Sequence, residues 1–201
     1  MTGPAEQAGP PWEQPATLAV IDMQRVFADR DSPWLVPRFA EVVGPIQRLV
    51  AAYRPRVIFT RFVAPAVPVG AWRRYYEVWP FALQPPDARI YELVDEFADE
   101  PGPTLDATTF GKVGDQLSMM VADGRLLLAG VSTDCCILST ALAAADDGVP
   151  VQVVADACAG VDDASHAKTL DILRLYGPLV EVISLADAIG QTPGSGAAQP
   201  A

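Results

Sequence analysis

Short apolar segments alternate along the chain with longer amphipathic segments of helical period. Unbroken apolar runs predict buried β-strands at 17–21, 57–61, 125–129, 151–155 and 180–183. Helical spacing predicts helices at 37–53, 90–97, 113–122, 134–147, 163–175 and 185–189. Parallel strands separated by helices are joined by right-handed crossovers, so the pattern predicts an α/β fold with three layers, helices on either side of one sheet (α-β-α). Its parallel sheet would be Rossmann-like, with helices on both faces.

Three segments lack this alternation. Residues 1–15 and 191–201 are rich in Pro and Gly without periodicity, so we expect two flexible tails around one domain at 16–190. The stretch 64–86 combines prolines with a crowd of aromatic residues and fits neither the strand nor the helix period. It is therefore expected to be a long aromatic loop, and such loops in compact α/β domains are usually functional.

Composition narrows the class of protein. Half of the 201 residues are hydrophobic and 19% are charged, which is typical of a globular domain. The net charge of −11 disfavours binding to nucleic acid or to an anionic membrane surface. No apolar run reaches membrane-span length and the N-terminus lacks a signal pattern, which favours a cytoplasmic protein with reduced cysteines. The single histidine, His166, excludes a multi-histidine metal site, so no metal or other cofactor is expected.

The segment 126–142 joins an apolar run to a helical pattern and places two adjacent cysteines at the junction. Gly130 ends the run, and Ser132 begins a group of residues suited to helix capping. Cys135 and Cys136 would then lie on the first helical turn, where the macrodipole and free N–H groups stabilise a thiolate and a nearby oxyanion. The pattern alone does not choose between the two, and either cysteine is also an ordinary buried core residue in other proteins.

Two further reactive side chains are expected at the same edge of the sheet. Ligands of open parallel sheets bind outside the carboxyl ends of the strands. Asp22 directly follows the first predicted strand, and Lys112 precedes a predicted helix. A carboxylate, a cation and a thiol can therefore converge. Asp22 would take the thiol proton, and Lys112 would favour both ionised groups.

Each of these residues also has a structural interpretation. Asp22 could be a turn residue, and Lys112 could be an ordinary solvated charge. We interpret Asp156, at the end of a predicted strand, as a cap or helix-joining residue. His166 lies at helical spacing from apolar residues and is interpreted as partly buried or at an interface, and Cys158 as a packing residue.

Four stretches together resemble the isochorismatase-like cysteine hydrolases, a superfamily that includes N-carbamoylsarcosine amidases and nicotinamidases. The stretches are 19–27 (Ala-Val-Ile-Asp-Met-Gln-Arg-Val-Phe), 110–112 (Phe-Gly-Lys), 129–138 (Ala-Gly-Val-Ser-Thr-Asp-Cys-Cys-Ile-Leu) and 156–160 (Asp-Ala-Cys-Ala-Gly). The family pattern Gly-x-x-Thr-x-x-Cys matches Gly130, Thr133 and Cys136. The resemblance thus selects Cys136 over Cys135 as the nucleophile.

The resemblance also implies a mechanism and an assembly. It places a catalytic triad on Asp22, Lys112 and Cys136, and an oxyanion hole on the backbone N–H groups of Ser132 and Cys136. It further implies a cis peptide bond at Val131–Ser132, which turns the Ser132 N–H toward that of Cys136, and it implies a homodimer or homotetramer.

Departures from family patterns narrow the activity. The region 60–72 lacks the histidines with which nicotinamidases bind a metal, and the presence of Cys136 argues against vinyl ether hydrolysis. The resemblance thus implies a metal-independent hydrolase of a C–N bond in a small amide, ureide or lactam, acting through a thioester acyl-enzyme. The alternatives are a family member acting on another bond type and a non-catalytic binding protein that retains the fold.

Candidate substrate-binding residues come from the aromatic positions and one basic position. The expected pocket wall consists of Phe27, Trp34, Trp72, Tyr76 and Trp79. Arg61, like the neighbouring arginines 73 and 74, could hold a substrate carboxylate. The alternative is that the aromatic stretch only roofs the sheet and that the arginines are surface residues.

Overall fold

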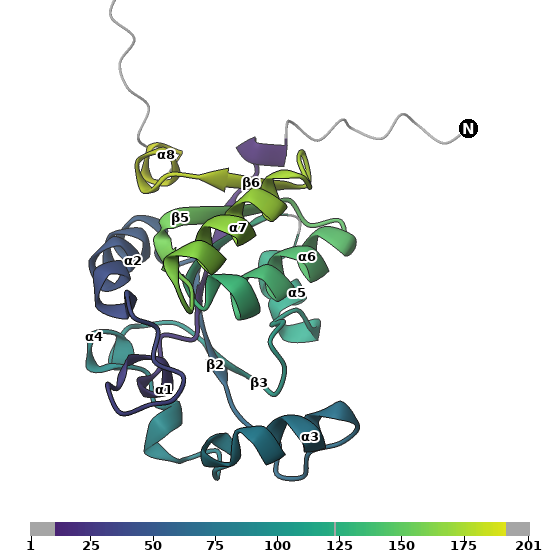
Figure 1. Cartoon of the computed structure of the whole chain (residues 1–201). Coiled ribbons are helices and arrows are strands. Elements are labelled where there is room, and N and C mark those ends of the chain that lie inside the picture. Colours follow the sequence, from purple (N-terminus) through teal and green to yellow (C-terminus); the bar gives the residue numbers. More distant parts are fainter. Residues whose placement is uncertain (1–10, 123, 192–201) are drawn as a thin grey trace, which may run out of the picture.

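One parallel sheet organises the protein. The computed structural model describes residues 11–122 and 124–191, and its six strands are arranged in the order β3-β2-β1-β4-β5-β6 (Figure 1). The strands are β1 (Ala16–Ile21), β2 (Val57–Phe62), β3 (Thr104–Ala107), β4 (Arg125–Val131), β5 (Val151–Ala159) and β6 (Val180–Ile183). The chain order reverses between β1 and β4, and ligands of open α/β sheets bind at such a switch point.

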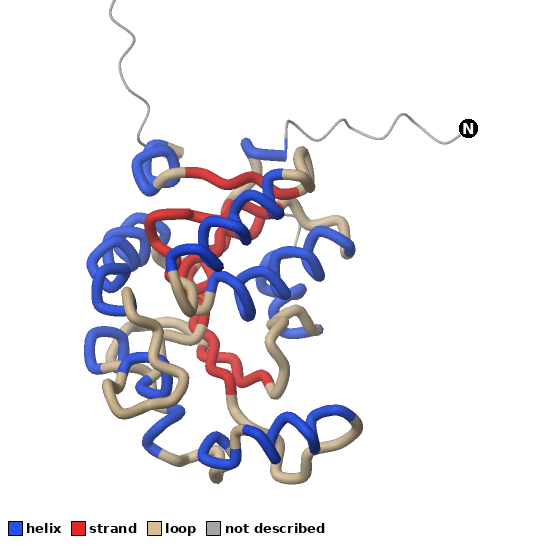
Figure 2. Tube along the Cα trace, viewed as in Figure 1, coloured by secondary structure: helices blue, strands red, loops and turns tan. Residues whose placement is uncertain are grey.

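Helices cover both faces of this sheet. The α-helices are α1 (Arg25–Ala28), α2 (Phe39–Tyr53), α3 (Ala71–Val78), α4 (Asp95–Ala98), α5 (Asp115–Val121), α6 (Leu138–Asp146), α7 (Asp163–Arg174) and α8 (Leu185–Gly190). Helices α2 and α8 pack on one face and α5, α6 and α7 on the other, as Figures 1 and 2 show. The predicted three-layer α-β-α fold is therefore confirmed.

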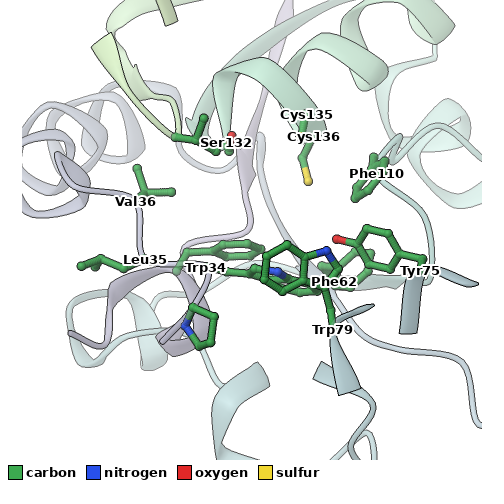
Figure 3. Close-up of a pocket in the computed structure, with 13 residues that line it drawn as sticks. Trp34, Leu35, Val36, Phe62, Tyr75, Trp79, Phe110, Ser132, Cys135 and Cys136 are labelled. Atoms are coloured by element: carbon green, nitrogen blue, oxygen red, sulfur yellow. The ribbon is translucent and has the colours of Figure 1, made fainter. Parts of the chain in front are cut away.

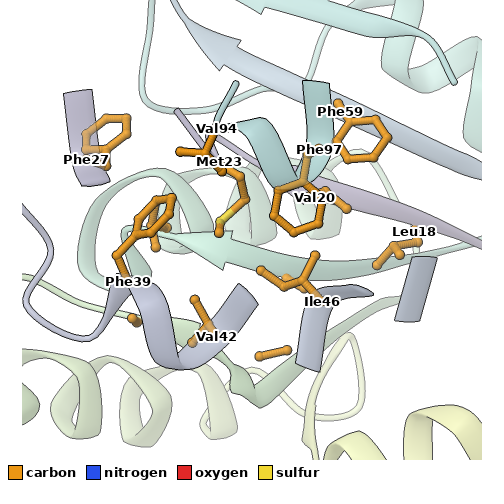
Figure 4. Close-up of a cluster of buried hydrophobic side chains, with 14 of the residues drawn as sticks. Leu18, Val20, Met23, Phe27, Phe39, Val42, Ile46, Phe59, Val94 and Phe97 are labelled. Atoms are coloured by element: carbon orange, nitrogen blue, oxygen red, sulfur yellow. The ribbon is translucent and has the colours of Figure 1, made fainter. Parts of the chain in front are cut away.

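The core follows the alternation of side chains along the central strands. In β1, Leu18 and Val20 belong to the cluster that packs under α2, whereas Ala19 and Ile21 belong to the cluster under α5 and α6. Figure 4 shows the first cluster, with Ile46 of α2 beside the strand residues. Burying a large apolar side chain stabilises the fold by about 1.5–3 kcal/mol, so both faces contribute.

The aromatic stretch is not the loop that the sequence predicts. The prediction for 64–86 is wrong over Ala71–Val78, which form α3 beyond the ends of β2 and β3 (Figure 1). Aromatic residues three and four positions apart, at 72, 75, 76 and 79, share one side of this helix. The flanking prolines conceal that helical period in the sequence.

Two smaller differences arise from tertiary contacts. The four-residue edge strand β3 is not expected from the sequence because its residues are partly exposed and form no apolar run. The helix predicted at 90–97 is instead a 3-10 turn at Arg89–Tyr91 followed by the single turn α4. Here Gln24 pairs with Leu93, and the Val94 N–H donates to the Met23 carbonyl, so long-range bonds replace helical ones.

The chain ends lie largely outside the description. The two expected tails fall mostly on residues 1–10 and 192–201, which are not among the described residues, while Pro11–Glu13 form a 3-10 turn. Every helix within residues 11–122 and 124–191 is too short or too polar to cross a membrane.

Gly130 permits the contact between the two central strands, and its replacement tests that constraint. Its φ is +123°, and a Cβ there would lie 2.1 Å from the Ile21 carbonyl oxygen. We expect Gly130→Ala to lower the free energy of unfolding by at least about 2 kcal/mol. Gly44→Ala in α2 is the control, because its Cβ would meet nothing within 4 Å. It should instead stabilise by about 0.5–1 kcal/mol in urea denaturation; equal effects would contradict the steric argument.

Candidate active site

A buried carboxylate lies at the switch point of the sheet. Asp22 directly follows β1, has a φ of +50° and is fully buried. The Thr60 hydroxyl, from β2, donates to Asp22 Oδ1 at 2.7 Å and accepts from the Asp22 N–H at 3.2 Å. Non-glycine residues in this left-handed region are uncommon and cluster at functional sites.

Lys112 forms an ion pair with that carboxylate. Its Nζ lies 2.8 Å from Asp22 Oδ2, and the two side chains are 1% and 0% exposed. The same Nζ donates to the Thr109 carbonyl at 3.2 Å and lies 5.3 Å from the centre of the Phe62 ring. Lys112 is therefore not a solvated charge, and its segment before α5 reaches the edge of the sheet as predicted.

Cys136 completes the cluster from the segment after β4. It lies in a π-helical turn, Thr133–Ile137, that precedes α6, so the expected first α-helical turn is wrong in detail. Burial and then the Asp22 carboxylate raise the pKa of the Cys136 thiol well above its ordinary value, while Lys112 lowers it. Burial and the neighbouring carboxylate thus favour the neutral thiol, whereas Lys112 favours the thiolate.

A hydroxyl bridge ties the thiol segment to the lysine segment. The Thr140 Oγ1 donates to the Cys136 carbonyl at 2.6 Å and accepts from the Lys112 N–H at 3.1 Å. Both contacts are buried, so a shift of either segment would leave a polar group without a partner.

Asp134 organises the loop on the other side of the thiol. Its Oδ1 accepts from the Ser132 hydroxyl at 2.8 Å and from the Val161 N–H at 2.9 Å. Gly160 allows this approach, because a Cβ there would lie 2.6 Å from the same oxygen. The cis peptide bond expected at Val131–Ser132 is present.

A cavity of about 360 Å³ opens at the thiol, whose sulfur points toward the rings of its wall (Figure 3). Its lining comprises Phe27, Pro33, Trp34, Leu35, Val36, Phe62, Tyr75, Trp79, Phe110, Ser132, Cys135, Cys136 and Val161. Five residues singled out from the sequence, at 27, 34, 79, 132 and 136, therefore lie on its wall.

Three other predicted residues do not reach the cavity. Trp72 packs behind the wall, with its ring 6.3 Å from that of Phe62, and Tyr76 is buried with its hydroxyl unpaired. Successive side chains of β2 point to opposite faces of the sheet, so that of Arg61 points away from the face on which Phe62 lies. Its Nε and Nη2 donate to the two oxygens of the Asp106 carboxylate, both at 2.7 Å. Arg61 therefore does not line this cavity, and its guanidinium is paired with Asp106, so its carboxylate-binding role stays a prediction.

The sequence analysis did not place eight of the lining residues on the pocket wall, namely Pro33, Leu35, Val36, Phe62, Tyr75, Phe110, Cys135 and Val161, although it considered Cys135 as an alternative nucleophile. Tyr75 lies on α3 and Trp79, four positions later, is the C-cap of that helix, so recognising the helix would have selected them together. Burial, followed by the nearby Cys135 thiol, raises the pKa of the Tyr75 hydroxyl. Burial also raises the pKa of the Cys135 thiol, to about 11.

The remaining candidates have structural roles. Asp156 Oδ1 accepts from the Leu185 N–H at 2.6 Å, and Cys158 is buried in the core, as predicted. His166 is partly buried, its Nδ1 lies 2.9 Å from the Thr133 Oγ1, and burial lowers its pKa. The described residues contain no group of three or more His, Cys, Asp or Glu side chains that could hold a metal ion.

Comparison with known proteins gives one family. The family model of the isochorismatase domain matches residues 16–187. No curated protein matches the chain. A cysteine hydrolase from Pseudomonas syringae pv. phaseolicola 1448A is similar in structure, with a TM-score of 0.78, 21% identity and coverage of 95% of this chain and 98% of that one.

Two enzymes named for their activity have the same fold. N-carbamoylsarcosine amidase from Thermoplasma acidophilum gives a TM-score of 0.67 at 21% identity, covering 85% of this chain and 96% of that chain. Nicotinamidase from Bacillus subtilis gives a TM-score of 0.66 at 18% identity, covering 85% and 99%.

A double-mutant cycle tests the ion pair. Lys112→Met should lower the free energy of unfolding by about 3–5 kcal/mol, because it leaves the Asp22 carboxylate buried without its cation. Asp22→Asn should also destabilise, whereas the double variant should be more stable than the sum of the two losses predicts. Urea denaturation measures all three.

Lys168→Met is the control, because Lys168 is exposed on α7, and we expect a change within about 0.5 kcal/mol. Strictly additive losses in the cycle would show that the two charges do not interact.

Proposed function

Because the chain belongs to the isochorismatase family, we propose that it is a cysteine hydrolase that cleaves a C–N bond in a small amide, ureide or lactam. The observation that carries the proposal is the sealed Lys112–Asp22 pair, 2.8 Å apart, next to a thiol that lines the cavity. The named activities of the amidase and nicotinamidase neighbours support the same class of reaction.

Asp22 is the base in the first step. It removes the proton of the Cys136 thiol as Sγ attacks the substrate carbonyl carbon, so that deprotonation and bond formation are coupled. The raised pKa of the Cys136 thiol supports this order, because burial and the Asp22 carboxylate both disfavour the thiolate before attack. The Lys112 Nζ lies 2.8 Å from Asp22 Oδ2 and holds in place the carboxylate that must accept the proton.

The carbonyl oxygen becomes an oxyanion, which the backbone N–H groups of Ser132 and Cys136 stabilise. Both residues line the cavity beside the reacting sulfur. As the C–N bond breaks, the Asp22 carboxylic acid returns its proton to the leaving nitrogen, and a thioester on Cys136 remains. Water, deprotonated by Asp22, then attacks the thioester and releases the acid, and the thiol recovers its proton.

The proposed reaction uses no metal ion or other cofactor. The protein sequence has a single histidine, and the described residues offer no three-ligand group. A nucleophile activated by a carboxylate needs no Lewis acid to generate it. A cytoplasmic location and the absence of nucleic-acid and membrane partners remain predictions from the sequence.

The nucleophile is tested by replacing each of the neighbouring cysteines. We expect Cys136→Ala and Cys136→Ser to lower kcat/KM by at least about 1,000-fold in an ammonia-release assay with EDTA present. Cys135→Ala is the matched control and should remain within about 10-fold, because its sulfur only lines the cavity. Circular dichroism should show folded protein for all variants. Activity that survives at position 136 but not at 135 would move the nucleophile, and loss of all activity with EDTA would contradict metal independence.

We also propose that the chain forms a homodimer or homotetramer. Large apolar side chains are exposed around α3 and after α7, including Val67, Val78 and Leu175. Light scattering at micromolar concentration should therefore give a mass at least twice the 21.4 kDa of one chain. A mass equal to that of one chain would refute the assembly.

A further inference from the structure

A separate cavity lies at the edge of the sheet opposite the thiol. It has a volume of about 640 Å³ and includes the first residues of β1 and β4, Ala16 and Arg125, which are paired in the sheet. Because the strands are parallel, Asp22 and Cys136 follow their other ends, about 20 Å away along the six residues of β1. Figure 1 shows α8, which is followed by the lining residue Gln191, on the far side of the molecule from α3. This cavity is therefore distinct from the candidate active site.

Positive charge dominates this cavity. Three arginines line it, namely Arg54, Arg56 and Arg125. The one acidic side chain among the described lining residues is Glu13, which is exposed. Arg54 pairs with Glu100, whereas Arg56 and Arg125 form no ion pair with any residue that the structure describes. The chain carries a net charge of −11, so this cavity is a local exception that attracts anions.

Arg125 is a buried cation whose hydrogen bonds, within the described part of the chain, go to neutral acceptors. The residue is 2% exposed, its Nε donates to the Gln14 carbonyl at 3.1 Å, and its Nη1 donates to Gln152 Oε1. Gln152 Nε2 donates in turn to Glu181 Oε2 at 3.0 Å, so that carboxylate reaches Arg125 only through an amide. Burying a charge without a directly paired opposite charge is costly. An anion that entered the cavity would remove that cost.

Tyr53, another lining residue, does not supply the missing negative charge. Burial raises the pKa of its hydroxyl, against the effect of the Arg125 charge, which lowers it. The hydroxyl donates to the Ala188 carbonyl at 2.6 Å, and this bond requires its proton. Tyr53 therefore stays neutral beside Arg125, and the charge of Arg125 remains available to a ligand.

The cavity also has an apolar wall and room for more than a simple ion. Its apolar lining residues are Trp12, Pro15, Ala16, Ala52 and Pro55. Pockets for small organic ligands typically measure about 300–1,000 Å³ and combine an apolar wall with a few polar groups. An inorganic ion would leave most of this wall without contact. The lining therefore favours a ligand that joins an anionic group to an apolar body.

We propose that this cavity is a second binding site, which takes a small phosphomonoester with an apolar ester group. The fork of an arginine side chain matches the oxygens of a phosphate. The two arginines without an ion pair, Arg56 and Arg125, balance the charge of nearly −2 that a phosphomonoester carries near neutral pH. The ester group then lies against Trp12 and the neighbouring prolines. This ligand is not the substrate of the thiol, because the two cavities lie at opposite edges of the sheet.

Three anions test the class of ligand. Phenyl phosphate has a dianionic group and an apolar ring, benzoate has the ring with a single charge, and inorganic phosphate lacks the ring. Isothermal titration calorimetry of the full chain at about pH 7.5 and constant ionic strength should give a Kd of about 1 mM or less for phenyl phosphate. The Kd should be at least about 10-fold higher for the other two. Equal affinity for benzoate would overturn the phosphate class, equal affinity for inorganic phosphate would overturn the apolar body, and no binding of phenyl phosphate would refute the site.

Substitutions of arginine locate the site. Arg125→Met should raise the Kd of phenyl phosphate by at least about 10-fold, and Arg56→Met by at least about 5-fold. Arg56 is exposed, so its variant tests the site even where Arg125→Met does not fold. The matched control, Arg73→Met, removes the same charge from an exposed position on α3 and should stay within about 2-fold. The same loss in the control, or no loss at Arg56, would overturn the inference.

A substitution in the thiol cavity separates the two sites. Trp79 lines the cavity at Cys136 and not the one at Arg125, so Trp79→Ala should bind phenyl phosphate within about 2-fold of the wild-type affinity. A loss of about 10-fold or more in this variant would place the phosphate at the thiol and contradict a second site. These measurements involve no hydrolysis, so their outcome is independent of the proposed reaction.

Discussion

The buried ion pair between Lys112 and Asp22 is the interaction on which the rest of the site depends. Removing two charges from water costs several kcal/mol per ion, which only close geometry and additional hydrogen bonds offset. Here the Thr60 hydroxyl and the Thr109 carbonyl supply those bonds. The pair therefore requires the ends of β1 and β2 and the segment before α5 to keep their relative positions.

The sheet meets that requirement through its topology. Strands β1 and β4 are neighbours at the switch point, so the residue after β1 and the turn after β4 lie at one edge. Gly130 allows the two strands to approach, and Gln24 fixes the end of β2 through bonds to the Phe62 N–H and carbonyl. The thiol of Cys136 thus lies beside the Asp22 carboxylate because of strand order and not because of sequence proximity.

This dependence explains what the sequence could predict. Apolar runs identify the long strands and hence the layers and the edge where Asp22 and Cys136 meet. They miss β3, which is short and half exposed, and α3, whose aromatic period is concealed by prolines. They also miss that Arg61 is paired with Asp106, because β3, which supplies that partner, is itself not predicted. Which partner a strand side chain meets depends on the register between neighbouring strands, and that register cannot be read from a local sequence pattern.

The charges of Lys112 and Asp22 lie outside the wall of the cavity at the thiol. The ion pair is neutral as a whole and sealed, so it acts on the adjacent sulfur but presents no charge to a ligand. Part of the cavity wall comes instead from Tyr75 of α3 and from the segment around Trp34, neither of which belongs to the sheet, whereas Phe62 is the last residue of β2. Substitutions of Trp34 or Tyr75 can therefore change which molecule binds while the Lys112–Asp22 pair stays in place, since these residues are held by different elements. Reaction type and substrate choice are in this sense separate properties of the fold.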